Sequence, residues 1–182
     1  MKLELKMIVV LFSVSVASAA LLSYVYTSTK PVIEKNNLKK EKEALQFISP
    51  DADTFIKVEL EKDTFFYCCT HKEDTIGLIF QIAPHGYGGP IKIMVGLKKD
   101  TTISRIRIAG PAEGLKETPG LGMNITEKSF QEQFSGKKEK EIFLKKDKKA
   151  GTIDAITAAT ISSRAVTNGI REGVKRFSKY LK

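Results

Sequence analysis

The pattern of hydrophobic and polar positions begins with one long apolar run. From Met7 to Tyr26 no charged residue interrupts the apolar side chains, and a helix of this length crosses a hydrocarbon core. Residues 32–48 then have a helix-compatible composition after Pro31, which suits the first turn of a helix. We therefore expect residues 1–6 as a cytoplasmic N-terminus, 7–28 as a transmembrane helix, 29–50 as a stalk or linker helix, and 51–182 as one domain.

Short runs of β-branched and aromatic residues follow, and they predict strands. These runs are Phe65–Cys68, Ile76–Ile82, Ile91–Leu97, Thr102–Ile108 and Ile142–Leu144. The glycine-rich turn His85–Pro90 and the pair Lys99-Asp100 predict tight connections between adjacent antiparallel strands. Ile106 and Ile108 alternate with Arg105 and Arg107, as in a sheet with one wet face.

Helical patterns occupy the C-terminal half. A short helix is expected from about Glu127 to Phe134, with Gly136 as its stop. A longer helix is expected from about Ser162 to Leu181, because an apolar stripe recurs at helical spacing, and the serines at its start are interpreted as its caps. The predicted fold class is α+β, with a mainly antiparallel sheet, packed helices and a long C-terminal helix.

The apolar run has a second interpretation as a cleaved signal peptide. Lys2 and Lys6 precede it, and Ala17-Ser18-Ala19 resembles a cleavage site. A retained anchor is favoured because apolarity continues to Tyr24 and Tyr26, where an interfacial belt would lie. Lysines after the run outnumber those before it, but acidic residues are interspersed, so charge does not settle the side of the membrane.

The chain of 182 residues carries a net charge of +9, mostly from scattered lysine. A solvated basic face is the simplest explanation, followed by contact with an anionic membrane surface or an acidic partner. Arginine is scarce and no aromatics alternate with the basic runs, so nucleic acid is not expected as a partner.

The stretch from Asp154 to Ser163 is the richest in candidate chemistry. Its four hydroxyls belong to Thr157, Thr160, Ser162 and Ser163, and they precede a helical pattern. Hydroxyl donors, backbone N–H groups and the positive end of a helix dipole can converge there on one phosphate. Helix capping explains one or two of these hydroxyls but does not need four. No Walker lysine or dinucleotide glycine pattern is present, which leaves a flavin mononucleotide phosphate as a candidate.

A second unusual segment combines a carboxylate, a hydroxyl, a proline and two glycines in six residues. It consists of Glu117, Thr118, Pro119, Gly120, Leu121 and Gly122. Such a segment is an ordinary surface turn or a loop whose backbone approaches a ligand closely, and on its own it favours the turn.

The sequence gives little support for a metal site or a catalytic site. Cys68 and Cys69 are adjacent and would point to opposite faces of a strand, and with His71 they do not make a closed metal set. We expect one core cysteine beside a more exposed one, with a strained vicinal disulfide in an oxidising compartment as the alternative. We expect no metal site and no catalytic residue, since no nucleophile–base or paired-carboxylate arrangement is evident.

The order of motifs carries a resemblance to a known family. Four motifs behind one N-terminal span resemble the G subunit of the Rnf electron-transport complex. In chain order they are Tyr87-Gly88-Gly89, Met94-Val95-Gly96-Leu97, Glu117–Gly122 and Asp154–Ser163. The related C subunit of the sodium-pumping NADH:quinone reductase shares the domain. The resemblance covers nearly the whole chain.

The resemblance implies a covalent flavin. In that family the final threonine of a Ser/Thr-Gly-Ala-Thr element is esterified to the phosphate of FMN by a flavin transferase. By position the acceptor is Thr160, with Asp154 and Thr157 as flanking residues, and the loop 117–122 lies against the ring and ribityl chain. This chain departs from the pattern at Ala158, where the family usually has glycine, and a requirement for positive φ there would make flavinylation slow or absent.

The resemblance also implies a function and a location. The chain is expected to relay electrons through FMN as a single-pass subunit in the cytoplasmic membrane, with its domain on the extracytoplasmic side and with other complex subunits, the transferase and membrane lipid as partners. It is an electron-transfer subunit and not a complete enzyme. The alternatives are the quinone reductase C subunit, a stand-alone flavin carrier, or a membrane-tethered binding module without a redox role.

Overall fold

The computed structural model describes residues 2–61, 64–72 and 74–181. The α-helices are α1 Lys2–Ile48, α2 Lys128–Gln131 and α3 Thr160–Phe177. The strands are β1 Thr54–Glu61, β2 Thr64–His71, β3 Asp74–Ile82, β4 Ile93–Lys98 and β5 Ile103–Ile108. Short 3₁₀ helices span Pro111–Glu113, Gly122–Thr126, Glu132–Phe134, Glu139–Glu141 and Ser178–Leu181.

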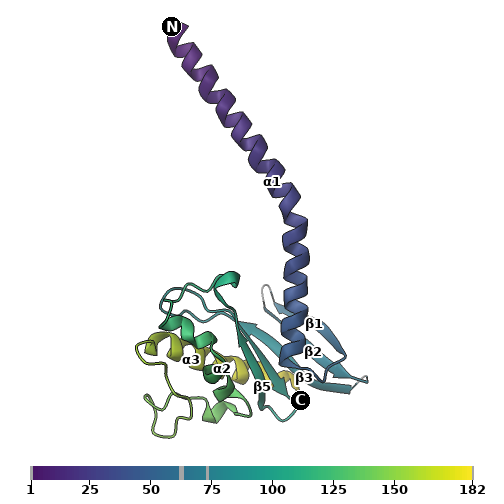
Figure 1. Cartoon of the computed structure of the whole chain (residues 1–182). Helices are drawn as coiled ribbons and strands as arrows, with labels where there is room; N and C mark the ends of the chain where they lie inside the picture. The colour runs from purple at the N-terminus through teal and green to yellow at the C-terminus, as the bar shows by residue number, and fades with distance from the viewer. Residues whose placement is uncertain (1, 62–63, 73, 182) are drawn as a thin grey trace. The chain divides into compact units, whose positions relative to one another are not determined.

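The apolar N-terminal run lies in α1, which is long and apolar enough to cross a membrane. The chain divides into two units, Met1–Glu43 and Ala44–Lys182. The predicted helical conformation of residues 32–48 is confirmed, and this helix is continuous with the apolar run because α1 has no break and Pro31 lies inside it. Figure 1 shows that α1 bends partway along, as expected for a helix in which proline removes one backbone hydrogen bond.

The second unit is built on one antiparallel sheet with the strand order β1-β2-β3-β4-β5. Each strand pairs with the next in the chain, so the predicted connections at His85–Pro90 and Lys99-Asp100 are confirmed. The predicted α+β class is also confirmed. The strand β1 was missed, although Ile56, Val58 and Leu60 alternate with charged residues as an edge strand does.

Alternation along β2 and β3 gives the sheet two different faces. Phe66, Leu78 and Phe80 face α3 and pack in the main core with its buried stripe. That stripe is Val166, Ile170, Val174 and Phe177. Tyr67, Cys69 and Ile79 belong to a second cluster with Leu45 and Ile48 from the last turn of α1. The sheet is therefore buried on both sides, and α3 is fixed along its length by the larger core.

Two further expectations in the C-terminal half have different outcomes. The short helix is confirmed as α2 followed by a 3₁₀ turn, with Phe130 and Phe134 both buried. The prediction of a strand at Ile142–Leu144 was wrong, because only a single bridge joins Leu144 to Ile153 in the described part of the chain. Ile142 and Leu144 are apolar because they are buried in the main core, and not because they form a ladder.

Candidate functional site

The segment from Asp154 to Ser163 forms an exposed turn that leads into the start of α3. The helix begins at Thr160, and Ala159 in the N-cap position has no side chain that can cap it. No acceptor among the described residues takes a hydrogen bond from the backbone N–H of Thr160, Ile161 or Ser162. These free N–H groups and the helix dipole favour an anion at this end of α3.

The predicted role of the serines as caps was wrong, because both lie inside the first turns of α3. Ser162 Oγ donates a hydrogen bond of 2.7 Å to Glu117 Oε2. Ser163 Oγ donates to the Ala159 carbonyl and accepts from the Ile156 N–H. Both hydroxyls are buried and form hydrogen bonds that hold the start of the helix to its surroundings.

The two threonines differ from the serines. Thr157 is exposed and Thr160 is half-buried. Within the described part of the chain, neither hydroxyl forms a hydrogen bond to a protein group. The four hydroxyls therefore divide into two that build the site and two that are free to react, and only Thr160 of the free pair belongs to the helix.

The turn contains a strained backbone position. Ala158 is exposed and has a φ of 61°, in the left-handed region that side chains rarely adopt. A residue with a Cβ at such a position raises the free energy of the folded state by about 1–2 kcal/mol. The positive φ considered in the sequence analysis is thus the conformation of this position.

Asp154 is held at both its backbone and its side chain. The side-chain amide of Gln133 accepts from the Asp154 N–H at 2.6 Å and donates to the Asp154 carbonyl at 3.5 Å. Lys145 Nζ lies 2.7 Å from Asp154 Oδ2, and both side chains are exposed. Asp154 is accordingly presented to solvent in a fixed position. Nothing in the sequence marked Gln133 or Lys145 for this role.

A second ion pair joins the lysine-rich loop to α3. The guanidinium of Arg164 donates two hydrogen bonds to the carboxylate of Asp147, at 2.7 and 2.6 Å. These bonds lower the pKa of Asp147 below its usual value. The pair ties residues 145–151 to the second turn of α3, beside the segment that precedes the helix.

The loop Glu117–Gly122 is turned inward at its ends and outward in its middle. Glu117 is 3% exposed and Gly122 is buried, whereas Thr118, Pro119, Gly120 and Leu121 are exposed. Glu117 Oε1 accepts from the Gly88 N–H at 3.1 Å while Oε2 accepts from Ser162. A Cβ at Gly122 would collide with Glu117 Oε2, so the glycine is needed for this close approach.

Exposed apolar side chains are adjacent in sequence to the residues that contact this carboxylate. Tyr87, Leu121 and Ile161 are 72%, 43% and 54% exposed. Each is the immediate neighbour in sequence of a residue that lies against Glu117, namely Gly86 and Gly88, Gly122, and Ser162. The three segments that meet at Glu117 thus each carry one exposed apolar side chain, and we call these three side chains the apolar rim.

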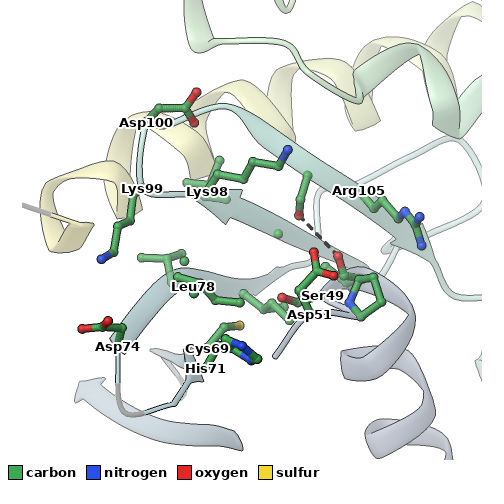
Figure 2. Close-up of a pocket in the computed structure, with 18 of the residues that line it drawn as sticks. Ser49, Asp51, Cys69, His71, Asp74, Leu78, Lys98, Lys99, Asp100 and Arg105 are labelled. Carbon is green, nitrogen blue, oxygen red and sulfur yellow. Dashed lines mark hydrogen bonds between the residues drawn. The ribbon is translucent and has the colours of Figure 1, made fainter. Parts of the chain in front are cut away.

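A groove of about 850 Å³ lies on the other face of the sheet, and Figure 2 shows its lining. The thiol of Cys69 lies on its floor near His71, and charged side chains such as Lys98 and Asp100 surround it. None of the predicted site residues lines this groove. Among the described residues, no group of three or more His, Cys, Asp or Glu side chains is arranged to hold a metal.

The cysteines follow the expectation from the sequence. Cys69 is buried and Cys68 is partly exposed, and neither forms a disulfide. Burial raises the pKa of the Cys69 thiol to about 11.

Comparison with known proteins gives matches over most of the chain. Residues 86–175 match the FMN-binding domain family. The chain is 33% identical over 164 residues to the G subunit of the proton-translocating ferredoxin:NAD(+) oxidoreductase complex of Clostridium ljungdahlii, covering 90% of this chain and 85% of that protein. It is 31% identical to the G subunit of the ion-translocating oxidoreductase complex of Methanosarcina acetivorans, covering 93% of this chain and 92% of that protein.

Solved structures share the fold. The C subunit of the Na(+)-translocating NADH-quinone reductase of Parabacteroides distasonis superposes with a TM-score of 0.52 at 23% identity, over 65% of this chain and 63% of that one. NqrC of Shewanella oneidensis superposes with a TM-score of 0.51 at 18% identity, over 74% of this chain and 73% of that one. At these identities the likeness concerns the fold alone.

Proposed function

Since the chain belongs to the family of Rnf-complex G subunits, which carry an FMN-binding domain, we propose that it holds FMN covalently on Thr160 and relays electrons within a membrane complex. The observation that carries this proposal is the division of the hydroxyls. Among the described residues of the segment, Thr160 alone combines a place in the first turn of α3, partial exposure and a hydroxyl without a protein partner.

The residues around Thr160 suit an esterified phosphate. The uncapped N–H groups of Thr160, Ile161 and Ser162 can donate to its oxygens, and the helix dipole stabilises its negative charge. The free hydroxyl of Thr157 is available as a further donor. Ser162 and Ser163 fix the first turn from inside and do not need to touch the cofactor.

The apolar rim suits a planar ring system. Tyr87, Leu121 and Ile161 offer exposed carbon surface within the arrangement that Glu117 holds together. The middle of the loop, Thr118 to Leu121, is exposed and lies against the ring and ribityl chain in this proposal. Bound FMN supplies reversible one-electron chemistry, while the protein supplies orientation and electrostatics.

The attachment is a phosphoryl transfer that the chain does not catalyse alone. A flavin transferase uses a flavin dinucleotide as donor. The bond between Thr160 Oγ1 and the flavin-side phosphorus forms while that phosphorus loses its bond to the bridging pyrophosphate oxygen. A nucleoside monophosphate leaves, and the hydroxyl proton passes to a base of the transferase. The exposed Asp154 and the strained turn at Ala158 are the features of this chain that the transferase would meet.

The partners follow from the family. The relatives belong to ion-translocating ferredoxin:NAD(+) oxidoreductase complexes, so the electron donor and acceptor in this proposal are other subunits of such a complex. In this proposal α1, which is long and apolar enough to cross a membrane, anchors the chain in lipid, and the second unit lies on the extracytoplasmic side.

The test is flavin transfer to the full-length chain co-expressed with a flavin transferase, followed by denaturing electrophoresis under ultraviolet light. We compare wild type with Thr160→Ala, Thr160→Ser and Thr157→Ala. Fluorescence should migrate with wild type and Thr157→Ala, be reduced in Thr160→Ser, and be absent from Thr160→Ala. Equal fluorescence in Thr160→Ala and wild type, or none in any variant, contradicts the proposal.

A further inference from the structure

Glu117 is a carboxylate that joins three separate segments of the site. It belongs to the loop 117–122, it accepts from Gly88 in the turn between β3 and β4, and it accepts from Ser162 in the first turn of α3. Its 3% exposure leaves it almost without contact to water. A buried carboxylate is unfavourable unless hydrogen-bond donors surround it, and both of its oxygens have one.

The packing around Glu117 is as close as its hydrogen bonds. A Cβ at Gly86 would collide with Glu117 Oε1, and one at Gly122 would collide with Glu117 Oε2. A Cβ at Gly88 would collide with the carbonyl of Lys116, immediately before Glu117. The three segments therefore meet at this residue with no room for another side chain.

The direction of the side chain separates Glu117 from the residues beside it. Its carboxylate points into the protein, whereas its neighbours in the loop, Thr118 to Leu121, are exposed. Each oxygen already accepts from a protein donor, and the 3% exposure of Glu117 leaves little surface for a contact with bound cofactor.

We propose that Glu117 is a positioning residue: its carboxylate fixes the first turn of α3, the turn at Gly88 and the loop 117–122 in the arrangement that presents Thr160 and the apolar rim. This inference rests on the proposed attachment of FMN to Thr160. Glu117 acts through the N-terminus of α3, where a buried negative charge next to the first turn also favours the helix. It does not touch the flavin.

The variants separate hydrogen bonding from charge and from general stability. Glu117→Gln keeps the shape, accepts from Gly88 and donates to Ser162 Oγ, so it restores both bonds without the charge. Glu117→Ala removes both bonds. The matched control is Glu113→Ala, because Glu113 also accepts from a glycine N–H, that of Gly110, and from a side chain, that of Arg107, and both of these donors lie outside α3.

Two measurements are made on full-length protein in detergent. The first is hydrogen exchange of the Gly88 amide in flavin-free protein, and the second is the initial rate of transfer from a flavin dinucleotide by purified transferase. Glu117→Ala should speed Gly88 exchange and slow transfer, each by about tenfold or more, since a buried donor loses its acceptor. Glu117→Gln should keep both within about threefold of wild type, and Glu113→Ala should leave both unchanged.

Two results would overturn the inference. One is that Glu117→Ala shows the same rate of Gly88 amide exchange and the same rate of flavin transfer as wild type. The other is a folded Glu117→Gln with a protected Gly88 amide that nevertheless loses transfer as fully as Glu117→Ala, because the carboxylate would then contact flavin or transferase directly. If Glu117→Ala does not fold, Ser162→Ala replaces it, and a transfer rate at the wild-type level contradicts the inference. If wild type accepts no flavin, the proposed function fails, while Gly88 exchange still reports on the role of Glu117.

Discussion

Replacing Ala158 by glycine should stabilise the folded protein, although glycine usually destabilises. Ala158 has a φ of 61° in an exposed turn, so its Cβ gains no burial that could offset the strained backbone. Glycine adopts this conformation without a steric penalty. Strain relief of about 1–2 kcal/mol is opposed by about 0.4–1 kcal/mol from the larger entropy of the unfolded chain.

The expected net stabilisation therefore lies between about 0 and 1.6 kcal/mol, and its central value of about 0.8 kcal/mol corresponds to roughly 2–4 °C in melting temperature for a domain of this size. The assay is urea and thermal denaturation of the full-length chain in detergent, followed by near-ultraviolet circular dichroism. The matched control is Ala150→Gly, since Ala150 is also exposed outside regular structure but is not among the described residues with positive φ. This control should lose about 0.4–1 kcal/mol.

A third variant tests whether backbone strain at Ala158 is the cause of the change in stability. Ala158→Val adds a β-branched side chain, which is disfavoured more strongly at positive φ, and should be less stable than wild type. If Ala158→Gly and Ala150→Gly change stability in the same direction and by the same amount, the backbone strain at Ala158 does not exist. Faster flavin transfer to Ala158→Gly than to wild type would further indicate that the transferase needs this conformation.

Three shorter predictions concern the surroundings of the site. Gly122→Ala should lower stability by at least about 1 kcal/mol in chemical denaturation, because the added methyl group meets a buried carboxylate, and an unchanged midpoint would contradict the packing described. Cys69 should resist alkylation at pH 8 while Cys68 reacts in the folded protein, because a pKa of about 11 leaves about one Cys69 thiol in a thousand ionised; mass mapping of the labelled peptide checks this, and equal labelling would refute it. The pKa of Asp147 is lowered in the folded state by Arg164, so the pair stabilises above about pH 4 and this contribution disappears as the pH falls through the lowered value. Asp147→Asn should therefore lower the urea midpoint at pH 7 slightly, and less so in high salt, whereas an equal loss at pH 2 would contradict the assignment.

The fold followed from the sequence where a local pattern was also the cause of the structure. Apolar and charged residues alternate in β5 because one face is buried, and α3 shows its stripe because that stripe packs on the sheet. The same pattern was present in β1 and was overlooked. Ile142 and Leu144 gave the opposite error, since burial in the main core produces apolar residues without a strand.

The composition of the candidate site was predictable from the sequence, but the directions of its side chains were not. Hydroxyl-rich sequence ahead of a helix indicated a phosphate, yet the sequence does not say that Ser162 and Ser163 turn inward while Thr157 and Thr160 remain free. It likewise does not show that the carboxylate of Glu117 is buried. These properties depend on segments that are distant along the chain and meet only after folding.

The resemblance and the sequence relatives agree on the family, and the attachment of the cofactor stays a prediction. Ala158 is the position where this chain departs from the pattern, and it has the conformation that glycine would favour. The departure therefore places a Cβ in a backbone conformation that disfavours it.

The central claim is tested most directly by mass spectrometry of the protein isolated from its native membrane. Intact mass and fragmentation of the peptide that contains Thr157, Thr160, Ser162 and Ser163 are measured together. We predict an added mass equal to FMN less one water, with fragment ions that assign it to Thr160. An unmodified peptide, or FMN assigned to any of the other three hydroxyls, would contradict the account.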